Sequence, residues 1–77
     1  MTTTLEILGR RCLETWGLEY FKNYFVFKHY VDGLPPERLL EEIEKVEDTE
    51  IFRILIAAGV PYPAQKMIIE RMEKLRK

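Results

Sequence analysis

The sequence predicts an all-α fold, a small bundle of four or five helices around a buried helix at residues 50–58. Apolar residues recur at helical spacing, most clearly in the run Ile51, Ile54, Leu55 and Ala58. The prolines stand at the edges of such periodic segments, and no second segment reads as a strand that could pair with another. Because the chain has only 77 residues, we predict a single helical domain over residues 1–77.

The first helix is expected over residues 4–16. Thr3 and Glu6 fit a capping box, in which the threonine hydroxyl caps the helix and the glutamate reaches back to the threonine backbone. Gly17 can end this helix in a left-handed conformation or merely bend it, which leaves a choice between five helices and four. The inward face is predicted to contain Leu5, Leu8, Cys12 and Trp16.

Aromatic residues are concentrated between Trp16 and Val31, and a helix over residues 18–31 accounts for their spacing. A long apolar stripe on this helix consists of Trp16, Tyr20, Tyr24, Phe27 and Val31. A shorter stripe on another side consists of Leu18, Phe21 and Phe25. Residues 24–31 also fit a strand, which would need a partner strand from a second copy of the chain. We favour the helix, and whether this stretch is core or interface stays open.

Three further helices are expected over residues 35–47, 50–58 and 63–76. A proline can occupy the first turn of the first and the last of these, where its missing N–H costs nothing. The helix at 50–58 is apolar nearly all round, so we expect it to be buried at the centre of the bundle. Gly59 is expected to end it.

Composition argues against several classes of protein. The formal net charge is −1, which disfavours strong non-specific binding of nucleic acid. Residues 37–50 are acidic and residues 66–77 are basic, and we expect two solvated helix faces that attract each other, within or between chains. Cys12 is the only cysteine, so a reducing, cytosolic location is expected. No segment reads as a signal peptide or as a membrane span.

Residues that could carry chemistry are scarce. The chain has no serine, and Cys12 and His29 are the only residues of their types, so a nucleophile–base pair has little support. One cysteine and one histidine cannot form a zinc site of the usual spacing, and no glycine-rich segment could cradle a phosphate. We therefore expect no enzyme activity, no metal and no cofactor. The scarcity of Asn and Gln beside many charged residues indicates a thermophilic source.

The aromatic stretch favours a small, non-catalytic cytosolic adaptor or regulator that works by binding protein. Tyrosine and tryptophan are enriched at interfaces because each has an apolar body and a polar tip. The partner is expected to be another protein or a second copy of the chain, with a homo-oligomer favoured. The predicted contact residues are Tyr20, Tyr24, Phe27 and Tyr30. A small-molecule sensor that binds its ligand in an aromatic core is a further possibility, but no distinctive residues mark it.

Residues 51–72, IFRILIAAGVPYPAQKMIIERM, have the proportions of a helix-turn-helix. This stretch resembles the first two helices of winged-helix DNA-binding domains, although neither a wing nor a third helix follows the pair. The resemblance implies a transcriptional regulator that binds DNA through residues 50–77, with Gln65, Lys66 and Ile69 facing outward where base contacts are made. In this alternative, the DNA-contacting residues are Gln65, Lys66 and Arg71.

Overall fold

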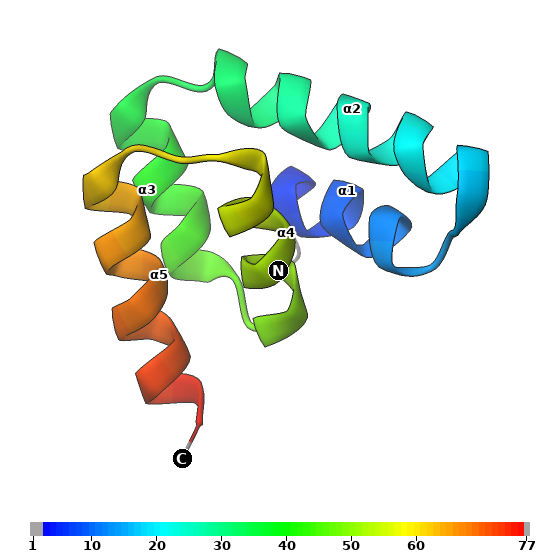
Figure 1. Cartoon of the computed structure of the whole chain (residues 1–77). Coiled ribbons are helices and arrows are strands. Elements are labelled where there is room, and N and C mark those ends of the chain that lie inside the picture. Colours follow the sequence, from blue (N-terminus) through cyan, green and yellow to red (C-terminus); the bar gives the residue numbers. More distant parts are fainter. Residues whose placement is uncertain (1–2, 77) are drawn as a thin grey trace.

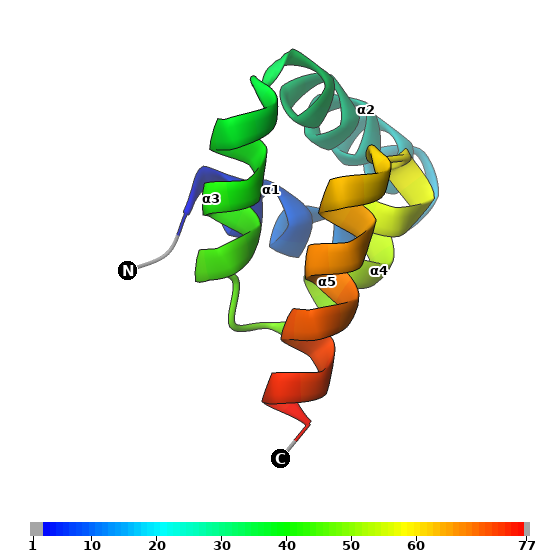
Figure 2. The same cartoon turned by 90° about the vertical axis from the view of Figure 1, so that its left-hand side faces the viewer.

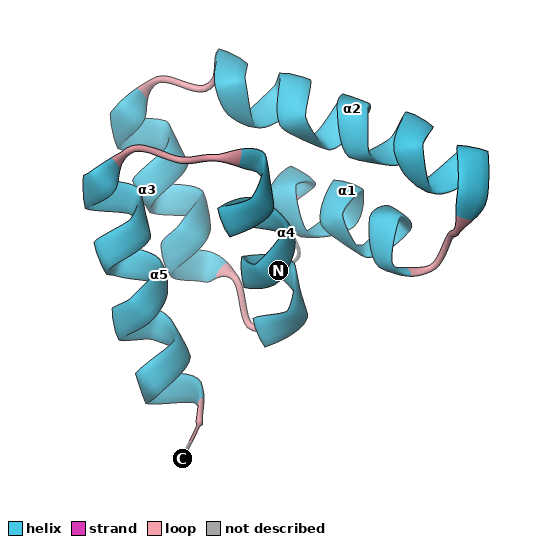
Figure 3. Ribbon diagram, viewed as in Figure 1, coloured by secondary structure: helices cyan, strands magenta, loops and turns pink. Residues whose placement is uncertain are grey.

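The computed structural model describes residues 3–76 and contains five α-helices, with no strand among those residues (Figure 1, Figure 3). The predicted all-α class is therefore confirmed, and the strand alternative for residues 24–31 is wrong because they lie within one long helix. The helices are α1 (Thr4–Leu13), α2 (Gly17–Gly33), α3 (Pro36–Lys45), α4 (Thr49–Ala58) and α5 (Tyr62–Leu75). Lys77, the last residue of the proposed DNA-binding range, lies outside the described residues.

The first helix ends at Leu13, earlier than the predicted residue 16, and the chain then reverses into α2. The Thr15 hydroxyl donates to the Arg11 carbonyl at 2.8 Å, and Gly17 has a φ of 66°. This backbone conformation suits glycine because it has no Cβ. The segment around Gly17 therefore separates two helices, which resolves the choice in favour of five.

Only half of the predicted capping box forms. The Thr3 hydroxyl accepts from the Glu6 N–H at 3.2 Å, as a helix cap should. The Glu6 carboxylate instead accepts from the Glu47 N–H at 3.3 Å, and Arg10 pairs with Asp48 at 3.0 Å. Glu6 and Arg10 therefore join α1 to the segment that connects α3 with α4.

Figure 1 shows α1 and α2 as an antiparallel hairpin, and Figure 2 shows α3 and α5 side by side. The α4 helix packs on both α1 and α5, so it links the hairpin to the rest of the protein. The first half of α2 and the end of α1 extend away from α3 and α5 (Figure 1). No helix within residues 3–76 has the length and apolar character needed to cross a bilayer.

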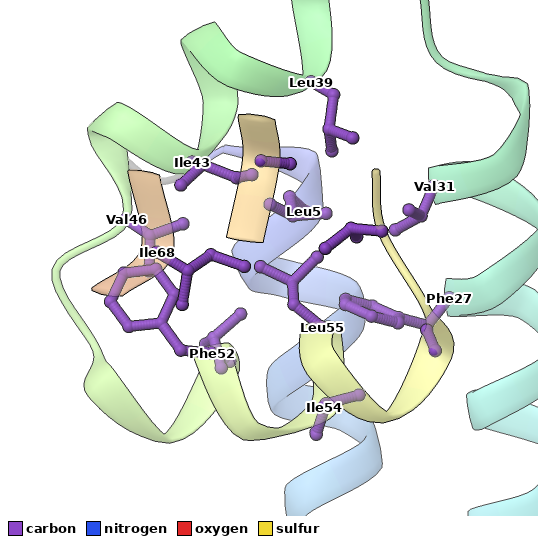
Figure 4. Packing of buried hydrophobic residues seen from close by; sticks show 14 of the residues in the cluster. Leu5, Phe27, Val31, Leu39, Ile43, Val46, Phe52, Ile54, Leu55 and Ile68 are labelled. Carbon is purple, nitrogen blue, oxygen red and sulfur yellow. The ribbon is translucent and has the colours of Figure 1, made fainter. Parts of the chain in front are cut away.

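One hydrophobic core receives side chains from all five helices (Figure 4). The largest share comes from α4, in which Ile51, Phe52 and Leu55 are fully buried. The prediction that residues 50–58 form the buried centre is therefore confirmed, although Ile56 on the same helix is exposed. Figure 4 labels Phe52 and Leu55 together with the core residues Leu5, Phe27, Val31, Leu39, Ile43, Val46, Ile54 and Ile68.

The α1 helix packs tightly against its neighbours at Gly9. A Cβ at this position would lie 2.8 Å from Ile51 Cδ1 and 3.3 Å from Phe27 Cε1. Both neighbours are fully buried and belong to α4 and α2. The missing side chain therefore lets three helices meet at one point.

Gly9→Ala should lower the free energy of unfolding by about 1 kcal/mol, measured by urea denaturation. Alanine favours helix by about 1 kcal/mol over glycine, but crowding in a packed core costs about 1–3 kcal/mol. Ile51→Val in the Gly9→Ala background should recover part of this loss because it removes the closest atom. Gly33→Ala is the control, since nothing lies within 4 Å of its Cβ position. A gain in stability for Gly9→Ala equal to that of Gly33→Ala would contradict the close packing.

Candidate interaction surface

The α2 helix carries aromatic residues on two faces that differ sharply in exposure. On the inner face Phe27 is fully buried and Val31 nearly so, while Tyr20 and Tyr24 are half-buried against the core. On the outer face Leu18, Phe21 and Phe25 are 80%, 57% and 65% exposed. These three residues, called the outer stripe below, follow i, i+3, i+7 and share one side of the helix.

The predicted contact residues Tyr20, Tyr24, Phe27 and Tyr30 therefore lie mainly on the inner face. Phe27 is fully buried in the core, so its side chain is not exposed at the surface of the folded chain. The other three rings are partly buried, and they pack against the core. Part of the aromatic stretch is exposed, but its most exposed side chains are those of the outer stripe and Trp16.

Polar groups on the inner side of α2 fasten the helix to its neighbours. The Tyr24 hydroxyl donates to the Ala57 carbonyl at 3.1 Å, and the Lys28 ammonium donates to the Ala58 carbonyl at 3.2 Å. Both acceptors lie at the C-terminus of α4, where helix carbonyls lack partners within the helix. The side chains of α2 thus donate to carbonyls of α4 that lack partners within the helix. These bonds fix the position of α2.

A buried carboxylate, Glu42 of α3, holds the second half of α2. Its Oε2 accepts from the Tyr30 hydroxyl at 2.6 Å, and its Oε1 accepts from the Leu5 N–H at 3.3 Å. Arg38, one helical turn away, places its Nε 3.4 Å from the same carboxylate. Burial raises the pKa of the Tyr30 hydroxyl, and the bond to Glu42 and its negative charge raise it further. Glu42 thus connects α1, α2 and α3.

The exposed rings of the outer stripe lean on the anchored tyrosines. Tyr20 and Tyr24 stack with their centroids 6.2 Å apart. Phe21 meets Tyr20 edge-on at 5.9 Å, and Phe25 meets Tyr24 edge-on at 6.1 Å. Such edge-to-face pairs contribute about 0.5–1.5 kcal/mol beyond the area they bury. The two exposed phenylalanines are therefore presented on a fixed aromatic support.

Trp16 lies at the tip of the α1–α2 hairpin and is 83% exposed. It lines a shallow hollow of about 270 Å³ together with Glu14, Thr15 and Glu19. The tip is held by the Asn23 amide, which donates to the Thr15 hydroxyl at 3.0 Å. The sequence pattern placed Trp16 on the core-facing stripe, but α1 ends before it and its ring stays outside.

The residues of the DNA-binding alternative lie on α5, which follows α4 after a short connection. The Gln65 amide donates to the Val60 carbonyl at 2.9 Å, and the Arg71 guanidinium donates to the Val46 carbonyl at 2.8 Å. Lys66 and Ile69 are exposed. Gln65 and Arg71, two of the three predicted DNA contacts, are therefore bonded to the chain's own backbone. Of the three, only Lys66 is free to point its positive charge outward, as a contact with DNA requires.

Other chemistry has little geometric support. Cys12 is fully buried, burial raises the pKa of its thiol, and His29 is exposed on another helix. No group of three or more His, Cys, Asp or Glu within residues 3–76 is arranged to hold a metal ion. An open groove of about 770 Å³ is lined by two threonines and by charged residues of both signs, namely Thr3, Thr4, Arg38, Glu41, Glu42, Glu44, Lys45, Glu47 and Arg71.

Comparison with known proteins gives no further guide to this surface. No protein-family model, no curated protein and no solved structure matches the chain.

Phe27→Ala and Phe25→Ala should separate the inner face of α2 from the outer one. Phe27→Ala removes a fully buried ring and should cost about 3–5 kcal/mol of unfolding free energy. Phe25→Ala removes an exposed ring and should cost less than about 1 kcal/mol, most of it from the contact with Tyr24. Urea denaturation of both variants measures the difference. Equal losses would contradict the assignment of the two faces.

Tyr30→Phe should change how stability depends on alkaline pH. The pKa of Tyr30 is raised in the folded state above its ordinary value of 10.0, so the folded protein holds this proton longer than the unfolded chain. The contribution to stability is therefore complete below about pH 10 and is lost as pH rises through the folded pKa. Thermal denaturation between pH 9 and 12 should show a steeper decline for the wild type than for Tyr30→Phe. The exposed Tyr62, changed to Phe, is the control and should keep the wild-type slope.

Proposed function

We propose that this chain is a small, non-catalytic protein-interaction module of the cytosol, an adaptor or regulator, and that it binds its partner through the outer stripe of α2. The observation that carries the proposal is the exposure of Leu18, Phe21 and Phe25 on a helix whose opposite face is anchored in the core. Burying these side chains against a partner would remove apolar surface from water, which is the main driving force of protein association.

The size of the exposed surface supports this use. If an aromatic side chain carries roughly 200 Å², the exposed parts of Phe21 and Phe25 amount to roughly 240 Å². Leu18 extends the same surface. Apolar patches of roughly 300–600 Å² on single chains are often functional. Scattered exposed residues such as Ile69 on α5 need no such explanation.

The charges around the outer stripe favour a protein partner over nucleic acid or a charged membrane. Glu19 and Asp32 lie on α2 along with Lys22 and Lys28, so neither sign dominates. Binding to phosphates requires clustered Lys and Arg, as does binding to anionic lipid. An apolar centre with a rim of mixed charge is the usual anatomy of a protein–protein interface.

Photo-crosslinking in cells that naturally produce the protein tests this proposal. A benzophenone amino acid replaces Phe25 in one variant and Ile69, which is also more than half exposed, in the other. The expected result is a covalent adduct with a protein from position 25 that is much stronger than any from position 69. Absence of a protein adduct from position 25, or equal adducts from both positions, would remove the proposal. The mass of the adduct also reports whether the partner is a second copy or a different protein.

A further inference from the structure

We infer that the occupant of the outer stripe is a second copy of this chain, packed with its α2 antiparallel to the first about a two-fold axis. This inference rests on the proposed function and adds the identity and orientation of the partner. A two-fold interface joins one surface to itself, so the surface must be complementary to its own copy. The outer stripe and its flank meet that requirement in charge, in spacing and in area.

Charge along the flank of the stripe is divided by position. Glu14 and Glu19 lie at the tip end of the hairpin, and Lys22 and His29 follow further along α2. Helical spacing places Lys22 and His29 on the same flank as Glu19. In the antiparallel arrangement Glu19 of one copy lies about 3 Å along the helix axis from Lys22 of the other, and the two Glu19 residues lie about 7.5 Å apart along that axis, while both Lys22 residues lie near the two-fold axis. A parallel arrangement in register sets Glu19 level with Glu19 and Lys22 level with Lys22, so the antiparallel arrangement is the more favourable in charge. Lys28 is neutralised within its own chain by Asp32 at 3.1 Å and adds little to this pattern.

The spacing of the apolar residues suits the same arrangement. Leu18 and Phe25 lie at equal distances, about 5 Å along the helix axis, on either side of the middle of the stripe. Phe21 lies within one residue of that middle. When two such helices pair antiparallel about this point, Leu18 of each copy lies level with Phe25 of the other, and the two Phe21 rings lie near the axis. Each copy therefore contributes its Leu18 to one contact and its Phe25 to the other.

The area and the position of the stripe fit a dimer better than a monomer. Two copies that cover their stripes and the polar atoms around them bury roughly 1,000 Å² in total, which is the lower end for specific interfaces. The first half of α2 projects beyond α3 and α5, so a second copy can approach it without meeting those helices (Figure 1). Two α1–α2 hairpins would then form one four-helix layer across the axis, with the anchored tyrosines inside each hairpin. An interface of this size predicts a reversible dimer.

Sedimentation equilibrium of the purified full chain between 1 and 200 µM tests the identity of the partner. The wild type should dimerise in this range, and Phe21→Glu should raise the dissociation constant by more than tenfold while circular dichroism stays unchanged. Ile69→Glu, which adds the same charge at an equally exposed residue of α5, should dimerise as the wild type does. A wild type that stays monomeric at 200 µM, or an Ile69→Glu variant that loses dimerisation as Phe21→Glu does, would overturn the inference.

Disulfide trapping tests the orientation. Chains carrying Leu18→Cys and Phe25→Cys are mixed and oxidised, with the buried native Cys12 present in both. An antiparallel pair should give mainly the mixed disulfide between the two variants, because residues 18 of the two copies lie about 10 Å apart along the axis and beyond disulfide reach. Disulfides mainly within each variant would overturn the antiparallel arrangement.

The two proposals can fail separately. A monomeric wild type together with a crosslink from position 25 to a different protein would overturn the second copy as partner and leave the proposed function standing. A monomeric wild type with no protein adduct from position 25 would overturn both.

Discussion

The α2 helix is fixed to the protein along one side only, and this constraint shapes the rest of the surface. Phe27 and Val31 enter the core, while the hydroxyls of Tyr24 and Tyr30 bond to α4 and α3. The helix has 17 residues, whereas α3 and α4 have 10 each, so its first half extends past them. There α1 runs along its inner side (Figure 1), and the Tyr24 hydroxyl reaches the end of α4. Leu18, Phe21 and Phe25 on the outer side stay more than half exposed.

The position of the hairpin depends on two buried carboxylates, which sequence reasoning assigned to other roles. Glu6 was expected to complete a capping box, and Glu42 was expected on a solvated acidic face, but each accepts a backbone N–H from another segment. A buried carboxylate is costly unless its oxygens are bonded. Tyr30 and Leu5 donate hydrogen bonds to Glu42, and Arg38 forms an ion pair with it. These contacts offset the cost of burying the carboxylate and connect three helices. The rest of the acidic residues of α3 do face outward.

The helices could be predicted because their signals are local. Periodicity and caps predicted the helical segments, with the break at Gly17 left open, and the apolar circumference of residues 50–58 predicted the centre of the core. Which stripe of α2 faces the core could not be settled from the sequence because it depends on distant groups. Tyr24 and Tyr30 can turn inward only because Ala57 and Glu42 supply acceptors, and no local pattern in α2 reveals those acceptors. The lengths of the two stripes did give an indication of which one faces the core. The outer stripe ends at Phe25, and the next residues on its side of the helix, His29 and Asp32, are polar.

Contacts between distant parts of the chain also weigh against the DNA-binding alternative. An arginine that contacts a base needs a free guanidinium. Arg71 instead bonds the carbonyl at the end of α3, where helix C-termini leave acceptors unpaired. This bond holds the guanidinium against the chain, and its Nε is buried, so Arg71 is not presented as a free fork for a base. The outer stripe of α2 is already exposed, and its rings pack edge-on against Tyr20, which is half-buried, and Tyr24, which is held by its bond to Ala57. Side chains ordered before binding lose less entropy on association, so this surface is better prepared for a partner than the positive residues of α5 are.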